Sequence, residues 1–186
     1  MIGVTIDDLR VGDRAEIRRV ARAADIAGFV DAVGDDNPIH SDPAFAAATR
    51  FKGRIAPGIW TAGLVSAVIG TRLPGPGTVY LSQDLEFVRP VMLGDAVTAR
   101  VEVVEVLRER NRVRLSTSCV NQRGDEVLRG EALVMPSREP VRYERPVRPG
   151  ALLTLWALGP WAWAAQGAAL TGALMWSAVA LSRPRR

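Results

Sequence analysis

The sequence predicts an α+β domain in which an antiparallel sheet wraps around a central buried helix. Residues 59–69 are apolar around most of a helical circumference, which is typical of a helix buried on nearly all sides. Segments with strand character follow at residues 78–87, 96–106, 113–120 and 127–135. A chain of 186 residues is long enough to bury such a core without disulfides or metals.

The N-terminal third predicts a strand and two helices. Residues 13–20 form the strand. A helix then begins near Arg22, and Gly34 ends it. Its apolar residues recur at the spacing of one helical face: Ile26, Phe29, Val30 and Val33. Asp42 is expected to cap a short helix over residues 43–48, because a proline follows at the first helical position.

The C-terminal half of the domain predicts strands joined by turns. Residues 96–106 alternate between apolar and polar side chains, as a strand with one buried face does. Residues 121–125 supply the polar and glycine side chains of a hairpin turn. We therefore expect the four strands after the buried helix to pair in hairpin succession, as a meander.

The only histidine of the chain, His40, stands five residues after the carboxylate of Asp35. An imidazole has a reference pKa of about 6.5, so it exchanges protons readily near neutral pH. Asp35 and His40 are therefore candidates for general acid–base catalysis. The alternative is structural, since Asp, Asn and Pro are ordinary turn residues and a single His beside them can be a satisfied surface group.

Four motifs occur in a fixed order along the chain. The first is Asp35-x-Asn37-Pro38-x-His40, and the others lie within residues 55–58, 73–81 and 87–95. Together they resemble the pattern of the MaoC-like (R)-specific enoyl-CoA hydratases, over roughly residues 8 to 136. The resemblance implies a hot-dog fold over residues 1–140 and a homodimer. It also implies hydration of trans-2-enoyl-CoA to (R)-3-hydroxyacyl-CoA, and we expect no cofactor.

Hydration of an enoyl thioester needs a base for water, an acid for C2 and a donor for the thioester oxygen. Asp35 and His40 can serve the first two needs around one shared water. Gly58 begins the buried helix, where a backbone N–H and the helix dipole can stabilise the oxyanion. The resemblance assigns these roles to the same three residues. It also implies that Ser66 supports the catalytic carboxylate.

Other residues near the motif have supporting roles or depart from the family pattern. Asn37 can bond back to the loop backbone, and Pro38 stiffens the loop. Lys52 or Arg54 could meet the phosphates of coenzyme A. Family members usually have His before the glycine at the helix start, but Pro57 stands there in this chain. We expect this change to spare the fold and to affect activity or substrate preference.

Composition excludes several functional classes. One cysteine, Cys119, rules out an intrachain disulfide and fits a reducing, cytoplasmic compartment, and we expect it to be a buried small hydrophobe. One His and one Cys give no zinc spacing, so no metal is expected. The net charge of +4 is spread among arginines without interleaved aromatics, which does not favour nucleic-acid binding.

The C-terminal segment, residues 141–186, differs from the rest of the chain. Residues 151–182 contain no charged side chain and four tryptophans, and arginines flank them on both sides. This length exceeds the ~20 residues of a membrane span. We expect the segment to associate with a membrane or lipid surface; packing against protein or a dispensable extension are the alternatives.

Two other functions remain compatible with the sequence. A hot-dog thioesterase would share the fold and substrate but hydrolyse the acyl–sulfur bond. A non-catalytic scaffold could bind acyl thioesters without turnover. The sequence does not distinguish coenzyme A from acyl carrier protein as the carrier of the acyl group.

Overall fold

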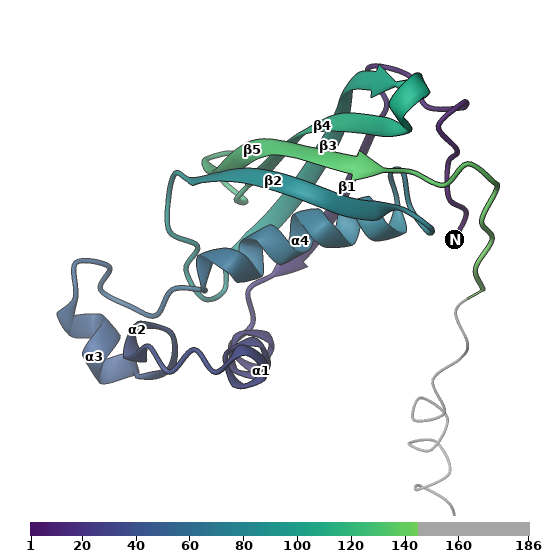
Figure 1. Cartoon of the computed structure of the whole chain (residues 1–186). Coiled ribbons are helices and arrows are strands. Elements are labelled where there is room, and N and C mark those ends of the chain that lie inside the picture. Colours follow the sequence, from purple (N-terminus) through teal and green to yellow (C-terminus); the bar gives the residue numbers. More distant parts are fainter. Residues whose placement is uncertain (145–186) are drawn as a thin grey trace, which may run out of the picture. The chain divides into compact units, whose positions relative to one another are not determined.

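The computed structural model describes residues 1–144, and its core is the helix α4 (Gly58–Thr71). This helix lies along one face of a curved antiparallel sheet (Figure 1). Its sheet-facing residues are buried, among them Leu64, Val65, Val68 and Ile69. The predicted central helix is therefore confirmed, and it is one residue longer at its start and two at its end.

The sheet has five antiparallel strands in the order β1-β3-β4-β5-β2. Their bounds are β1 Arg14–Val20, β2 Val79–Phe87, β3 Ala96–Leu107, β4 Arg112–Val120 and β5 Glu126–Met135. Strands β3, β4 and β5 form the expected meander. The expected hairpin between β2 and β3 is wrong, because β2 pairs with β5 instead. Alternation of side chains identifies a strand but does not specify its pairing partner.

The inner face of the sheet supplies the other half of the core. Cross-strand neighbours such as Val103 and Leu115 point toward α4 and are fully buried. Strand β2 closes against β5 at Gly130, where a Cβ would collide with the backbone carbonyl oxygen of Asp84. The absence of a side chain at this position lets the edge strand pack tightly onto β5.

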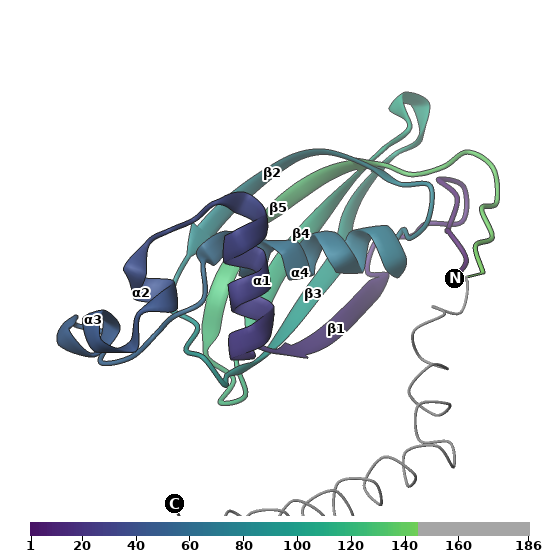
Figure 2. The same cartoon turned by 90° about the horizontal axis from the view of Figure 1, so that it is seen from below.

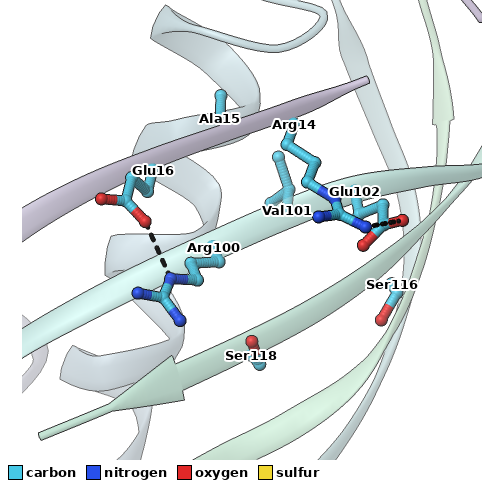
Figure 3. Close-up of a pocket in the computed structure, with 8 residues that line it drawn as sticks. All are labelled: Arg14, Ala15, Glu16, Arg100, Val101, Glu102, Ser116 and Ser118. Carbon is cyan, nitrogen blue, oxygen red and sulfur yellow. Dashed lines mark hydrogen bonds and ion pairs between the residues drawn. The ribbon is translucent and has the colours of Figure 1, made fainter. Parts of the chain in front are cut away.

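The outer face of the sheet carries charged side chains in cross-strand pairs (Figure 3). Arg14 Nη2 lies 2.9 Å from Glu102 Oε1, and Arg100 Nε lies 2.8 Å from Glu16 Oε2. These residues border a shallow hollow of about 530 Å³ that none of the expected site residues lines. Because each charge has an opposite partner, this surface offers little uncompensated charge to a ligand.

Three N-terminal helices follow β1: α1 (Ala23–Val33), α2 (Pro38–Ser41) and α3 (Pro43–Ala48). Helix α1 crosses α4 on the side that faces away from the sheet, and α2 and α3 lie beyond the start of α4 (Figures 1 and 2). The first and last were predicted. Helix α2 was not, since only a loop was expected there. Asn37 caps α2 and Pro38 provides its first residue, so a single turn forms.

The expected C-terminal tail falls almost wholly outside the described residues. The described part ends soon after a backbone bridge between Ile2 and Arg142. Within residues 1–144, no helix is long and apolar enough to span a membrane. The expectation of membrane association through residues 151–182 therefore stays a prediction from sequence.

Candidate active site

The imidazole of His40 lies in α2 and is almost completely buried. Its Nδ1 is 2.8 Å from the carbonyl oxygen of Ile55. A carbonyl oxygen only accepts hydrogen bonds, so this partner assigns the proton of the neutral ring to Nδ1. Nε2 is then left with a free lone pair. The ring is thus held by one nitrogen and can act as a base through the other.

Asp35 faces the free nitrogen of this ring. It follows α1 directly, because Gly34 ends that helix in a left-handed conformation with φ of 71°. Its Oδ2 lies 3.6 Å from His40 Nε2, and its Oδ1 accepts a hydrogen bond of 3.3 Å from the backbone N–H of Asn37. The distance of 3.6 Å is too long for a direct hydrogen bond, so both atoms stay available to a water or substrate atom placed beside them.

The loop between Asp35 and His40 is held by its own side chains. The Asn37 Oδ1 accepts a hydrogen bond of 3.3 Å from the N–H of Ile39, which caps α2. Pro38 fixes φ at the start of the turn. The backbone N–H of Ile55 also bonds the carbonyl of Ile39, at 3.4 Å. The segment that carries the histidine is therefore tied to the segment that leads into α4.

Gly58 is the first residue of α4 and leaves its backbone donor free. Pro57 precedes it without capping the helix by a side chain, and within residues 1–144 the N–H of Gly58 has no acceptor. The positive end of the helix dipole lies here as well. As expected, Pro57 is compatible with the fold: α4 begins directly after it, and its carbonyl accepts a bond of 3.0 Å from Trp60 N.

The ring of Phe87, at the end of β2, covers the Cα of Gly58. A Cβ at Gly58 would lie 2.8 Å from Phe87 Cε1, which is closer than an ordinary contact. Both residues line a groove of about 440 Å³ whose walls come from α4, β2 and the adjoining loops. The sequence motif includes both residues, but their contact across 29 positions could not be predicted from spacing.

Ser66 makes no hydrogen bond to Asp35 or His40 within residues 1–144. It sits two turns after Gly58, about 12 Å along the helix axis, and is exposed. Its side chain makes no hydrogen bond within the described part of the chain. Lys52 and Arg54 do not line the groove either, and Arg54 Nη1 is 3.5 Å from the carbonyl oxygen of Ser41.

The described residues contain neither a cluster of metal-binding side chains nor an exposed thiol. No three His, Cys, Asp or Glu side chains gather there in a way that could hold a metal ion. Cys119 lies in the buried core of β4, as predicted, and burial raises the pKa of its thiol to about 12. Such a thiol stays protonated and is a poor nucleophile at neutral pH.

A five-stranded antiparallel sheet curved around one central helix defines the hot-dog fold class, and solved structures share it with this chain. The R-hydratase PhaJ1 from Pseudomonas aeruginosa superposes with a TM-score of 0.76 at 44% identity, covering 80% of this chain and 95% of that one. The (R)-hydratase from A. caviae involved in PHA biosynthesis gives a TM-score of 0.66 at 42% identity, covering 68% of this chain and 96% of that one.

Sequence comparison identifies the family within this class. Residues 10–124 match the MaoC-like domain. The 3-hydroxybutyryl-CoA dehydratase of Methylorubrum extorquens is 52% identical over 135 residues, 72% of this chain and 85% of the relative. The (R)-specific enoyl-CoA hydratase of Rhodospirillum rubrum is 43% identical over 133 residues, which are 71% of this chain and 92% of the relative. The chain belongs to the MaoC-like family, and both the family and the hot-dog fold predicted from sequence are confirmed.

Proposed function

We propose that this chain is a lyase that adds water to trans-2-enoyl-CoA to give (R)-3-hydroxyacyl-CoA, and that also catalyses the reverse dehydration. The observation that carries the proposal is the Asp35–His40 pair, with 3.6 Å between Oδ2 and Nε2. Neither atom is taken up by a direct hydrogen bond to the other, so both can contact one water placed beside them. The names of the relatives, hydratases and a dehydratase of acyl-CoA thioesters, support the same reaction.

In the proposed mechanism, the water between Asp35 and His40 loses a proton to one of them as its oxygen bonds to C3 of the substrate. The electrons of the C2–C3 double bond move toward the thioester carbonyl, whose oxygen becomes negative. The free N–H of Gly58 donates a hydrogen bond to this oxygen. The group that took the proton from water then gives it to C2, so Asp35 and His40 return to their starting protonation states. Oxygen and proton add from one face of the substrate, which favours a single stereoisomer.

The test of the proposal is the hydration of crotonyl-CoA by the purified protein. Loss of absorbance at the enoyl thioester band without release of free thiol supports a hydratase. Release of thiol at the same rate would instead indicate the thioesterase alternative, and neither change would indicate a scaffold. Chiral analysis of the product distinguishes further, since (S)-3-hydroxybutyryl-CoA would contradict the proposed geometry.

We also propose that the protein acts as a homodimer. Strand β2 is an edge of the sheet, with its backbone open to pairing and with exposed apolar side chains at Val79 and Leu81. Beside it, α4 exposes Ile59 and a strip of small residues that includes Ser66. A second copy would cover both surfaces at once. Light scattering at micromolar concentration tests this, and a fully active monomer would contradict it.

In such a dimer, Ser66 would support the Asp35 carboxylate of the second copy rather than its own. This assignment rests on the distance along α4 between Ser66 and the start of the helix. Mixing Asp35→Asn and Ser66→Ala chains tests it, because a mixed dimer then holds one site with both residues native. Random mixing of two inactive variants should restore about a quarter of full activity. No recovery would place Ser66 in its own protomer's site.

For the tail, we propose association with a membrane or lipid surface through residues 151–182, in an otherwise cytoplasmic enzyme. The support is compositional: 32 residues without charge, with four tryptophans and flanking arginines. Carbonate-resistant pelleting of the full chain, but not of a chain ending at Arg148, is the expected result. If both chains remain in the supernatant with equal activity, the tail packs on protein or is dispensable.

A further inference from the structure

The groove beside Gly58 has charged side chains of one sign only. It begins at the first turn of α4 and its walls are mainly apolar, with Phe51 and Phe87 among them. The charged residues in its lining are Arg50, from the turn after α3, and Arg89, from the loop after β2. No carboxylate lines it. The groove therefore combines an apolar interior with two cationic groups.

Neither arginine forms a direct ion pair with a carboxylate of residues 1–144. The Arg50 guanidinium lies over the ring of Phe51, 4.7 Å from its centroid, and has no carboxylate within ion-pair distance. Arg89 donates from Nη1 to the carbonyl oxygen of Glu126, at 3.0 Å, which orients the guanidinium and leaves other N–H groups free. This differs from the outer face of the sheet, where arginines such as Arg100 are paired.

Two carboxylates in the neighbourhood of Arg89, those of Asp125 and Glu126, already have other partners. Asp125 Oδ2 accepts from Asn121 and from Arg123 Nε, each at 3.0 Å. The Glu126 Oε2 lies 3.4 Å from Arg129 Nη1. These acids are therefore partly neutralised by other groups, although Arg89 also attracts the Asp125 carboxylate and helps to lower its pKa. An anion that enters the groove would meet two guanidinium groups whose charge is available to it.

We propose that Arg50 and Arg89 bind the phosphate groups of coenzyme A and make the enzyme selective for coenzyme A thioesters over carrier-protein thioesters. This inference rests on the proposed function. The thioester carbonyl must reach the N–H of Gly58, so the uncharged pantetheine arm lies along the apolar groove. The far end of the arm carries phosphates, which a guanidinium group can bind through two N–H donors at once.

The preference for coenzyme A over a carrier protein follows from the presence of two cationic side chains in the groove. Coenzyme A presents a diphosphate and a ribose phosphate at the end of its arm, so it can occupy both arginines. A carrier protein presents a single phosphodiester and then its own surface. The relatives at 52% and 43% identity are named for coenzyme A substrates, whereas the acyl-carrier-protein dehydratase of Arabidopsis thaliana is 32% identical.

The experiment compares three crotonyl thioesters: those of coenzyme A, of pantetheine without phosphates, and of an acyl carrier protein. In the Arg50→Gln/Arg89→Gln variant, we expect KM for crotonyl-CoA to rise at least tenfold with kcat within twofold of the native value. KM for the other two substrates should stay within twofold. The native KM for crotonyl-CoA should also rise with salt, and the variant should lose most of this dependence.

Matched controls separate charge from folding. Arg18→Gln removes an exposed arginine of β1 outside the groove and should change none of these constants. Arg50→Lys/Arg89→Lys keeps the positive charges but lacks the bidentate guanidinium donors, and it should recover part of the lost affinity for crotonyl-CoA. An unchanged KM for crotonyl-CoA, or an equal rise for pantetheine, would overturn the proposal. An equal rise for the carrier protein would overturn the selectivity. Failure of the proposed function itself would appear as no hydration of any substrate by the native protein.

Discussion

Replacing Gly58 by alanine tests the role of the α4 N-terminus more directly than any other single change. The added Cβ would lie 2.8 Å from Phe87 Cε1, so the ring must retreat by about 0.6 Å to regain an ordinary contact of 3.4 Å. Overpacking costs about 1–3 kcal/mol, and the half-exposed Phe87 ring can move, so we expect about 1 kcal/mol. For a domain of this size, that lowers Tm by about 2–4 °C.

The effect on activity should be much larger than the effect on stability. The methyl group occupies the space through which the thioester oxygen approaches the N–H of residue 58. Loss of one oxyanion donor reduces kcat by about 10²–10³-fold. Hydration of crotonyl-CoA, followed at the enoyl thioester band, measures this loss. A Gly58→Ala enzyme with kcat within threefold of the native value would refute the assignment of this donor.

Two further variants isolate the cause of that loss. Gly28→Ala adds a methyl group in the middle of α1, where nothing lies within 4 Å, and should stabilise the protein by ~1 kcal/mol without changing kcat. Phe87→Ala in the Gly58→Ala background removes the clash, so kcat should stay low if the methyl group itself blocks the oxyanion. If kcat recovered, displacement of the ring rather than the blocked oxyanion would explain the loss.

Three other outcomes are expected. Asp35→Asn and His40→Ala should each lower kcat by about 10²-fold or more while the fold is kept, although loss of the buried imidazole leaves the Ile55 carbonyl without its partner and should lower Tm in His40→Ala. A folded His40→Ala enzyme with normal kcat would contradict the mechanism. Burial raises the Cys119 pKa to about 12, so at pH 8 only about 10⁻⁴ of the thiol is ionised and the native protein should resist thiol reagents until unfolded. Gly130→Ala should cost at least ~2 kcal/mol, measured by denaturant unfolding, because its Cβ meets the backbone of Asp84.

The features that could be predicted from sequence depend on residues close together in the chain or on a single helix. Helix α4 is apolar on nearly all sides, so its burial follows from composition alone. Asp35 and His40 lie within six residues of each other, and the loop between them fixes their relation. For this reason their proximity was predictable before any tertiary contact was known.

The features that could not be predicted depend on contacts between distant segments. The pairing of β2 with β5 joins strands more than forty residues apart, and side-chain alternation is the same for any partner. The contact of Phe87 with Gly58 depends on that pairing. The groove is lined by Arg50 and Arg89 and not by Lys52 or Arg54, because charge and nearness in sequence do not show which side chains share a surface.

The strand order also has a consequence for synthesis of the protein. Strand β2 leaves the ribosome soon after α4, but its partner β5 ends roughly sixty residues beyond the helix. At about 5–20 residues per second, the apolar helix waits roughly 3–13 s before the sheet can close over it. During that interval the nascent chain presents its most aggregation-prone surface. Slow decoding of residues 72–135, or loss of a chaperone that holds apolar helices, should therefore reduce the yield of folded enzyme without changing the stability of molecules that do fold.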